Sequence, residues 1–416
     1  MTRRAVITGI GTVTGLGRGA TTVHDAQCAG RSAVVRPPAD HPVHGVVEFA
    51  APAAPMRARD VMRPPIEPCL DRFLLLALAA AADAMRDAGL EAGVDADPER
   101  IGCVVSTGGG GLETYEEHAV RRRERGRSAI SPFLAPGILT NMAAARIALK
   151  YGLRGPSTSI TTACAAGAQS VAEGLRLLRE GAADVVVCGG VDTPLHPTVA
   201  ATFFNAKVTA HGFDDPAAAS RPFDRDRNGF VLAEGAAVLV LERPEHADAR
   251  GAAGWADVVG WASSTDAFHV TAPRPDGSGA AACLRRALAD AGIAPGDVGH
   301  LNAHGTGTKV GDLAEARAVR AVFGGAGPAV SATKSVLGHT LGAGGAIEAA
   351  VTAVTLARGL LPPTRNLTSV DPECELDHVV GAPRPAAPDF AVSTSFAFGG
   401  HNLGLVLAPA STRRRR

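Results

Sequence analysis

The sequence predicts an α/β fold built from two similar units. Segments rich in β-branched residues alternate with helical patterns in both halves of the chain, and apolar runs such as 184–190 and 236–241 are typical of strands buried on both faces. A chain of 416 residues can bury a large core, which suits a duplicated architecture. Hydrophobic residues make up 46% and charged residues 20%, as in ordinary globular proteins.

The first half opens with a strand at 5–8, and we interpret the glycines that follow it as turn residues. Residues 31–68 show no sustained period and predict a loop with short elements. An amphipathic helical pattern then runs from Leu74 to Met85 and ends at Gly89. The remaining expected elements are a strand at 102–107, four glycines at 108–111, a helix at 168–180, the strands at 184–190 and 236–241, and a long loop at 203–229.

The second half repeats the alternation of strands and helices. Residues 242–254 form the expected connection, and a strand near Val258 begins the new unit. The further elements are a helix at 284–291, a strand at 298–303, a helix from Asp312, a strand at 329–332, a helix at 347–356, and strands at 391–395 and 403–407. We therefore divide the chain into an N-terminal half, residues 1–254, and a C-terminal half, residues 255–416.

Charge, cysteine content and apolar runs argue against several classes of protein. Lysine plus arginine balances aspartate plus glutamate at 41 each, so no overall charge indicates a nucleic-acid or membrane partner. Seven cysteines without CxxC spacing argue against a disulfide scaffold and a zinc site. The N-terminus lacks the apolar core of a signal peptide, and no apolar run is long enough to span a bilayer, so we expect a cytoplasmic protein.

The glycines near the N-terminus raise a weaker alternative, a dinucleotide-binding oxidoreductase. The fingerprint for that function needs a third glycine where Thr14 stands, and no clear helix follows at once. We therefore give this alternative little weight.

Cys164 lies where a predicted strand turns into a predicted helix. Apolar residues at helical spacing follow it as far as Glu180, and Gly181 ends the pattern. We expect the free N–H groups and the positive end of this helix to lower the pKa of the thiol. The small neighbouring residues leave the sulfur open to a bulky electrophile. Although most cysteines are inert core residues, this one is a candidate nucleophile.

Two histidines lie in glycine-flanked loops at predicted strand ends. His304 stands within Asn302–Thr308, and His339 follows Lys334 after the next strand; the last pair of strands is joined by Phe396–Gly400. Ligands of α/β proteins bind at strand ends, and a cysteine accompanied by two such histidines favours covalent catalysis. No metal-ligand spacing is recognisable, so a substrate site is favoured over a zinc site.

Together these motifs resemble the elongating β-ketoacyl-acyl-carrier-protein synthases and the related type II polyketide ketosynthases, over essentially the whole chain. The motifs that carry the resemblance are Thr162–Cys164, Asn302–Thr308 with Gly311, Asp312 and Glu315, Lys334–His339, Ser220–Asp224 and Phe396–Gly400. The resemblance implies a thiolase-like fold, with two βαβαβαββ halves in a five-layered α-β-α-β-α core. It also implies a dimer.

Two residues separate the chain from close relatives of that family. The acetyl-CoA-using initiating branch has asparagine at the position of His339, and chain-length-factor subunits have lost the cysteine at the position of Cys164. Both residues are present here, so the resemblance implies an elongating enzyme.

The resemblance also implies the reaction. Cys164 takes an acyl group from an acyl carrier protein, and decarboxylation of malonyl-carrier protein then extends that group by two carbons. The N–H groups of Cys164 and Phe398 form the oxyanion hole, while His304 and His339 donate hydrogen bonds to the malonyl thioester oxygen. No metal or organic cofactor is needed. The supporting residues it implies are Lys334 acting with Glu315, Asp312, and the phosphopantetheine-binding Thr271, Thr306 and Thr308.

Substrate choice is predicted from a few further positions. Gly109 stands where many fatty-acid enzymes have a bulky aliphatic residue, so we expect a long pocket that accepts medium to long, or extended rigid, acyl chains. Ala397 precedes the gating Phe398 where the family usually has glycine, which predicts a stiffer gate. Phe133 and Phe203 are further pocket candidates, and Arg63, Arg127 and Lys207 are the candidate residues for carrier docking.

The expected partners are the acyl carrier protein and a second copy of this chain, with no nucleic acid and no membrane. One alternative is a heterodimer in which a chain-length-factor-like subunit is required for activity. Another is a thiolase that acts on coenzyme A thioesters; that reaction uses a second cysteine near the C-terminus, where this chain has Phe398 and His401. The choice between fatty-acid and polyketide synthesis stays open.

Overall fold

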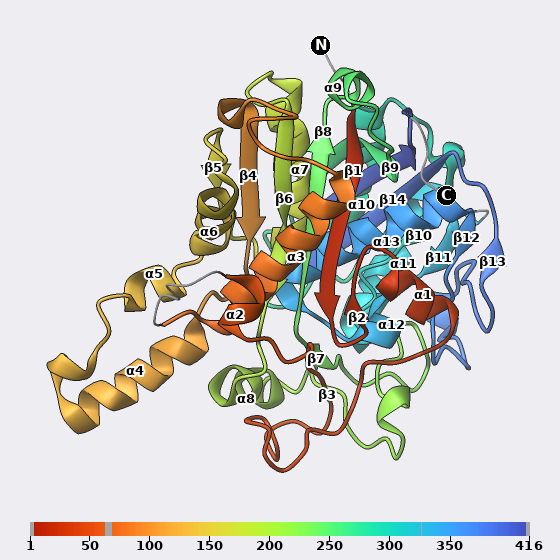
Figure 1. Cartoon of the computed structure of the whole chain (residues 1–416). Coiled ribbons are helices and arrows are strands. Elements are labelled where there is room, and N and C mark those ends of the chain that lie inside the picture. Colours follow the sequence, from red (N-terminus) through yellow and green to blue (C-terminus); the bar gives the residue numbers. More distant parts are fainter. Residues whose placement is uncertain (1–3, 63–68, 326, 413–416) are drawn as a thin grey trace.

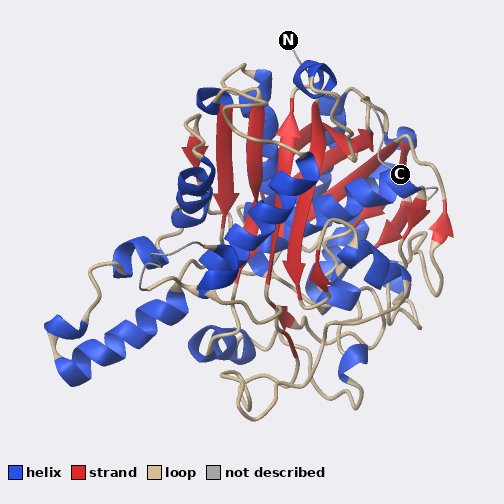
Figure 2. Ribbon diagram, viewed as in Figure 1, coloured by secondary structure: helices blue, strands red, loops and turns tan. Residues whose placement is uncertain are grey.

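The computed structural model describes residues 4–62, 69–325 and 327–412. Figure 1 labels the helices and strands, and Figure 2 colours them by type. The elements of the first half are β1 (Ala5–Thr14), β2 (Gly17–Arg18), α1 (Thr22–Cys28), β3 (Ala50–Ala51), α2 (Ala58–Val61), α3 (Arg72–Ala88), β4 (Ile101–Ser106), α4 (Leu112–Arg125), α5 (Leu134–Ile138), α6 (Met142–Tyr151), β5 (Ser157–Thr158), α7 (Ala166–Arg179), β6 (Val185–Asp192), α8 (Pro197–Asn205), β7 (Leu232–Ala233), β8 (Gly235–Glu242) and α9 (Pro244–Ala249).

The second half contains the corresponding elements. They are β9 (Ala256–Thr265), α10 (Ser278–Ala291), β10 (Val298–Asn302), α11 (Lys309–Phe323), β11 (Ala329–Ser331), α12 (Lys334–Leu337), α13 (Gly344–Arg358), β12 (Leu360–Leu361), β13 (Arg384–Pro385), β14 (Phe390–Ala397) and β15 (His401–Pro409). Two short 3-10 turns matter for the site: η3 (Ala163–Ala165) leads into α7, and η6 (Leu341–Ala343) leads into α13.

The strand order is the same in both halves. From the centre outward it is β1, β8, β6, β4, β5 on one side and β9, β15, β14, β10, β11 on the other. In each half the first two pairings are antiparallel and the last two are parallel. A short antiparallel pairing between β1 and β9 joins the halves. The predicted α/β fold of two similar units is confirmed, while the division at residue 254 stays a prediction.

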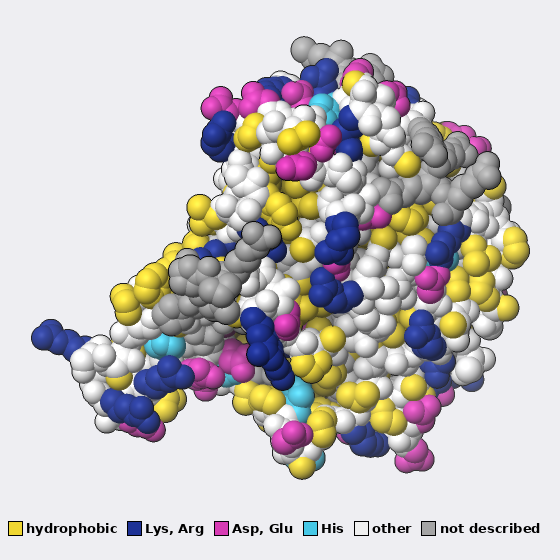
Figure 3. Space-filling model, viewed as in Figure 1, with side chains coloured by type: hydrophobic (Ala, Val, Ile, Leu, Met, Phe, Trp, Pro, Cys, Tyr) yellow, Lys and Arg dark blue, Asp and Glu magenta, His cyan; other side chains and the backbone are white. Residues whose placement is uncertain are grey.

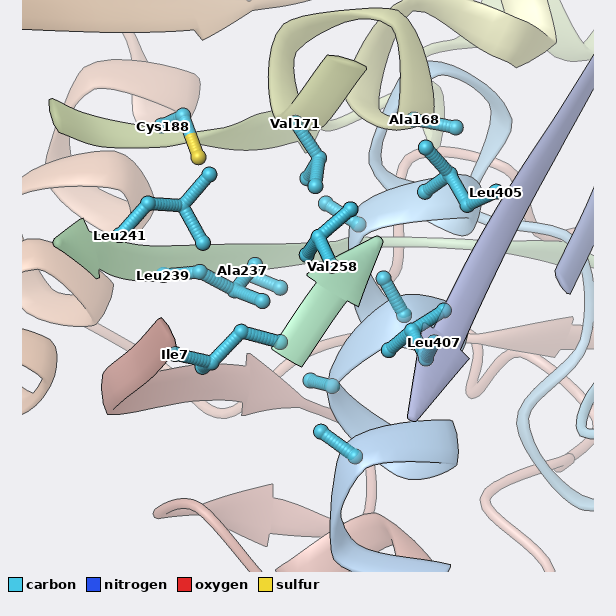
Figure 4. Packing of buried hydrophobic residues seen from close by; sticks show 14 of the residues in the cluster. Ile7, Ala168, Val171, Cys188, Ala237, Leu239, Leu241, Val258, Leu405 and Leu407 are labelled. Atoms are coloured by element: carbon cyan, nitrogen blue, oxygen red, sulfur yellow. The ribbon is translucent and has the colours of Figure 1, made fainter. Parts of the chain in front are cut away.

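Helices α7 and α13 pack against each other in the middle of the molecule, and the alternation of side chains along the strands accounts for the layers. Ala237, Leu239 and Leu241 of β8 belong to the core that holds α7 and α13 (Figure 4). Their neighbours Ala236, Val238 and Val240 belong to the core under α3, on the other face. Helix α10 covers the outer face of the second half, which completes the five layers α-β-α-β-α.

The prediction that the first glycines form a turn is wrong for Gly9 and Gly11. Both lie inside β1, which continues to Thr14. Helix α3 lies so close to the strand that a Cβ on Gly9 would come within 2.2 Å of the Ala84 carbonyl oxygen, and one on Gly11 within 2.0 Å of the Ala80 carbonyl oxygen. These glycines let the alanine-rich helix pack directly on the strand.

Other differences are smaller. Helix α8 reaches into the segment expected as a loop at 203–229, and α9 lies within the expected connection at 242–254. Helices α4 and α5 form an arm that projects from the body of the molecule, at the lower left of Figure 1. Among the described residues, no helix combines the length and the hydropathy that a membrane span requires.

A buried carboxylate fastens the end of β8 to its neighbours. Glu242 is fully buried, and its oxygens accept hydrogen bonds from His246 Nδ1 at 2.6 Å, from Arg250 Nε at 2.8 Å and from the Thr8 hydroxyl. Burial by itself would raise the pKa of this carboxyl, but its hydrogen bonds to Arg250 and His246 outweigh burial and lower the pKa to about 2.

We expect Glu242 to stabilise the fold above the pKa of an unfolded glutamate, near 4.5, and this contribution to disappear as the pH falls through about 2. Glu242→Gln should lower the free energy of unfolding at pH 7 by on the order of 3 kcal/mol, and by much less near pH 2. Urea denaturation across this pH range measures the effect, with the exposed Glu124→Gln as the control. A loss independent of pH would contradict the assignment.

Candidate active site

Cys164 sits at the turn between β5 and α7, as the sequence predicts. It is the middle residue of η3 and lies two residues before the start of α7. The preceding Ala163 has φ +47°, a conformation uncommon for residues other than glycine, and this sharp turn presents the side chain of Cys164 to a cavity. The thiol is half-buried, so a substrate can approach it.

The expectation of a lowered thiol pKa is wrong. Burial raises the pKa of Cys164 to about 12, outweighing the opposite effects of the Lys334 charge and of the N–H groups of Phe398 and Cys164. The loss of hydration around the sulfur depends on tertiary packing, which the local helix pattern does not reveal. The two N–H groups that act on the sulfur are those predicted to form the oxyanion hole.

His304 follows β10 in a loop that a buried carboxylate holds in place. The N–H of His304 donates to Glu315 Oε1 and to the Thr394 hydroxyl, both at 2.9 Å, and the N–H of Gly305 donates to Glu315 Oε2 at 2.8 Å. Burial raises the pKa of Glu315 to about 6. Asp312, one turn earlier on α11, also holds this loop in place, because its carboxylate accepts a hydrogen bond from the N–H of Gly307 at 3.0 Å.

Lys334 takes a different carboxylate partner from the one expected. Its Nζ pairs with Glu348 of α13 and lies 3.1 Å from His304 Nδ1, while Glu315 binds backbone N–H groups instead. If the ammonium donates to Nδ1, the proton of a neutral His304 ring is on Nε2. Burial raises the pKa of Glu348 to about 7, against the lowering effect of Lys334.

The two histidines form a pair of neutral rings. Their centroids are 5.3 Å apart with planes at 87°, and Phe230 packs edge-on against His339. Burial lowers the pKa of both histidines well below 6.5, and the Lys334 charge adds to the effect. Neutral rings can donate hydrogen bonds to an oxygen that gains negative charge without carrying charge themselves.

A cavity of about 380 Å³ connects these groups to the surface. The predicted site residues that line it are Cys164, His304, His339, Glu315, Asp312, Phe398, Ala397, Phe203, Thr306, Thr308, Thr271 and Lys207. Thr308 also caps α11, and its hydroxyl lies 3.1 Å from that of Thr306. No group of three or more metal-ligating side chains occurs in the ranges that the structure describes.

A second cavity, of about 210 Å³, leads from Cys164 in another direction. Gly109, which the sequence places in the acyl pocket, lines this cavity, and its role towards the acyl chain stays a prediction. Phe398, Phe203 and Leu341 line both cavities, so they lie between them. Ala397 lines only the first cavity.

Two of the predicted pocket and docking residues lie on the projecting arm. Phe133 lines neither cavity, because it lies between α4 and α5, where it is 41% exposed. Arg127 begins the 3-10 turn Arg127–Ala129 just after α4 and lines neither cavity. Figure 3 shows lysine and arginine side chains gathered on the projecting arm. Lys207 is exposed at the mouth, and Arg63 lies outside the described residues.

Sequence reasoning missed Glu348 and Asp192. Glu348 lies in the middle of an apolar helix, where the pattern predicts a buried packing position rather than a functional one. Asp192 ends β6 and accepts hydrogen bonds from the N–H groups of Gly108, Gly109 and Gly342 and from the Thr107 hydroxyl. It explains the glycine run, since a Cβ on Gly108 would come within 2.7 Å of Asp192 Oδ2.

Comparison with known proteins agrees with this arrangement. Residues 2–247 match the model of the beta-ketoacyl synthase N-terminal domain, and residues 255–368 match that of the C-terminal domain. The chain belongs to the β-ketoacyl synthase family. It is 38% identical to the 3-oxoacyl-[acyl-carrier-protein] synthase 2 of Synechocystis sp., over 97% of both chains.

Solved ketosynthase structures have the same fold. The type II polyketide synthase complex AntDE:AntF, an acyl-carrier protein with its ketosynthase bound to the hexaketide, aligns with a TM-score of 0.90 and 29% identity over 99% of this chain and 100% of that one. The ishigamide ketosynthase/chain length factor aligns with the same score and coverage and 34% identity. The thiolase-like fold predicted from the motifs is therefore confirmed.

We expect Glu348→Gln to slow condensation roughly 10-fold or more, because Lys334 then loses the carboxylate that holds it against His304. The wild-type rate should rise as the pH increases through about 7, where Glu348 loses its proton, and the variant should lack this rise. Single-turnover rates from pH 6 to 8.5 measure both effects. An unchanged pH profile in the variant, with its Tm intact, would refute this role.

We expect Gly109→Ile to shift selectivity towards shorter acyl chains. A Cβ at Gly109 would meet Leu112 Cδ1 at 3.5 Å and Asp192 Oδ1 at 3.8 Å, so the backbone accepts a side chain that then fills the second cavity. Acylation by long-chain substrates should fall roughly 10-fold relative to short-chain ones. Gly109→Ala should give a smaller shift in the same direction. Equal chain-length profiles in all three proteins would rule out this pocket.

Proposed function

We propose that this protein is an acyltransferase that joins an acyl group held on Cys164 to malonyl-acyl-carrier protein, with loss of CO2, and so extends the acyl chain by two carbons. One observation carries the proposal: Cys164 lies where two cavities meet, with His304 and His339 in the larger one. One cavity suits the acyl group and the other suits the arm that delivers the extender. Membership of the β-ketoacyl synthase family supports it.

In the first half-reaction the sulfur of Cys164 attacks the carbonyl carbon of an acyl thioester, and the carrier's thiol leaves with the proton of Cys164. Since burial raises the pKa of the thiol to about 12, we expect the proton to leave as the bond forms. The N–H groups of Cys164 and Phe398 stabilise the tetrahedral oxyanion. The acyl chain then occupies the cavity beside Gly109.

In the second half-reaction malonyl-carrier protein enters the larger cavity. Its carboxylate leaves as CO2, and the electron pair passes to the thioester oxygen, where His304 Nε2–H and His339 donate hydrogen bonds. The resulting enolate carbon attacks the carbonyl carbon of the acyl-cysteine, the C–S bond breaks, and the sulfur of Cys164 takes a proton from water. Thr306, Thr308 and Thr271 hold the phosphopantetheine arm along the cavity wall. No cofactor takes part in either step.

The proposed partners are an acyl carrier protein and a second copy of this chain. Lys207 at the cavity mouth would meet an acidic carrier, and Arg127 and Arg63 are the further candidate residues for carrier docking. The arm supports a homodimer, because Tyr115 and Leu139 are more than half exposed on it and would gain by burial against a partner. A heterodimer is the alternative, because the chain is similar in structure to the ishigamide ketosynthase/chain length factor. We propose a cytoplasmic location.

Intact-mass analysis after mixing the protein with acyl-carrier proteins of several chain lengths tests the first half-reaction. We expect one acyl adduct per chain, absent from Cys164→Ser and retained in Cys28→Ser, which replaces another half-buried cysteine. An adduct that survives in Cys164→Ser, or no adduct with any carrier, would contradict the proposed function.

A further inference from the structure

The cavity beside Gly109 contains a carboxyl group that a plain hydrocarbon chain would not satisfy. Glu113, in the first turn of α4, lines this cavity together with Thr193, which follows β6, and His196, which precedes α8. These residues line only this cavity, whereas Phe398, Phe203 and Leu341 also line the larger one. Glu113 therefore lies beyond the junction, along the route of the acyl chain.

Among the described residues, the neighbouring acidic groups accept hydrogen bonds and Glu113 accepts none, although the charge of Arg72 acts on Glu113 beyond ion-pair distance. Glu116, one turn further along α4, accepts from the Thr198 hydroxyl at 2.7 Å and lies 3.0 Å from His196 Nε2. Asp192 has four donors. In the described part of the chain the Glu113 carboxyl receives no hydrogen bond and forms no ion pair, and burial, followed by the negative charge of Asp71, raises its pKa.

His196, on the same wall, also has a ring nitrogen without a hydrogen-bond partner among the described residues. The residue is 7% exposed, and its Nδ1 is a buried atom without a hydrogen-bond partner. Since a carboxylate only accepts, the ring nitrogen beside Glu116 is the one that carries the proton, and in the neutral ring Nδ1 is an acceptor. Among the described residues His196 Nδ1 thus also lacks a donor, but as a buried atom it is closed to the contents of the cavity, so Glu113 is the group that the acyl chain meets.

We propose that the acyl group accepted by this protein carries a hydroxyl on the part of the chain that lies beside Glu113. A methylene chain packed there would displace water from the Glu113 carboxyl without replacing its hydrogen bonds, whereas a hydroxyl would donate a hydrogen bond to the carboxyl. The rest of the wall, including Val199, Pro194 and Leu112, is apolar and suits the hydrocarbon part of the same chain. This inference rests on the proposed function and narrows its substrate class.

The test compares two series of acyl-carrier proteins, matched in length, one with a terminal hydroxyl and one with a terminal methyl group. The rate of Cys164 acylation is measured by intact mass in the wild type, in Glu113→Leu and in the control Glu117→Leu, which alters an exposed side chain on the same helix. We expect the wild type to favour the hydroxyl at one or more chain lengths. Glu113→Leu should reduce this preference about 10-fold or more, and Glu117→Leu should keep it.

Faster acylation by methyl-terminated chains at every length, or a hydroxyl preference that survives in Glu113→Leu, would overturn the inference and leave the condensing function standing. Absence of acylation by either series would refute the proposed function itself. If Glu113→Leu does not fold, Glu113→Met gives the same comparison, since methionine is about as long as glutamate and has no oxygen that accepts a hydrogen bond.

Discussion

The active site depends on the contact between α7 and α13 at the end where both helices begin. A Cβ on Gly167 would come within 2.6 Å of the Gly342 carbonyl oxygen, and one on Gly345 within 2.6 Å of Ala168 Cβ. Only small residues allow this approach, which brings η3 with its nucleophile beside η6 and the helix that carries Glu348. Asp192 ties η6 to the glycine loop after β4 through its hydrogen bonds to Gly342 and Gly108.

Burial controls the charges of the site more strongly than local dipoles do. The same desolvation raises the pKa of the Cys164 thiol to about 12 and lowers the pKa of His304 and His339 well below 6.5. The site therefore presents a thiol and two neutral rings around one buried cation, Lys334. Charge that develops on a substrate oxygen meets fixed donors with little water between them, which favours steps in which negative charge forms transiently.

The sequence predicts most of this site, and its failures have physical causes. His304 and Phe398 stand in glycine-containing turns next to clear strands, and Cys164 precedes a clear helix, so their positions follow from local patterns. The raised pKa of the Cys164 thiol does not, because it depends on tertiary packing. The Lys334–Glu348 pair does not follow from local patterns, because it joins positions 14 residues apart on two helices and Glu348 lies within an apolar run. Gly9 and Gly11 look like turn residues until α3 is packed against β1, because only tertiary structure shows what a Cβ would strike.

The measurement that tests the account most directly is a single turnover from pre-formed acyl-Cys164. Isolated acyl-enzyme is mixed with malonyl-carrier protein labelled with ¹³C at the carbon beside the thioester, and the acyl-enzyme, CO2 and carrier-bound product are quantified together. The account predicts that one acyl group leaves Cys164 for each CO2 released and appears two carbons longer on the carrier, with the label retained. Release of CO2 while the acyl group stays on Cys164, or transfer of that group without elongation, would contradict it.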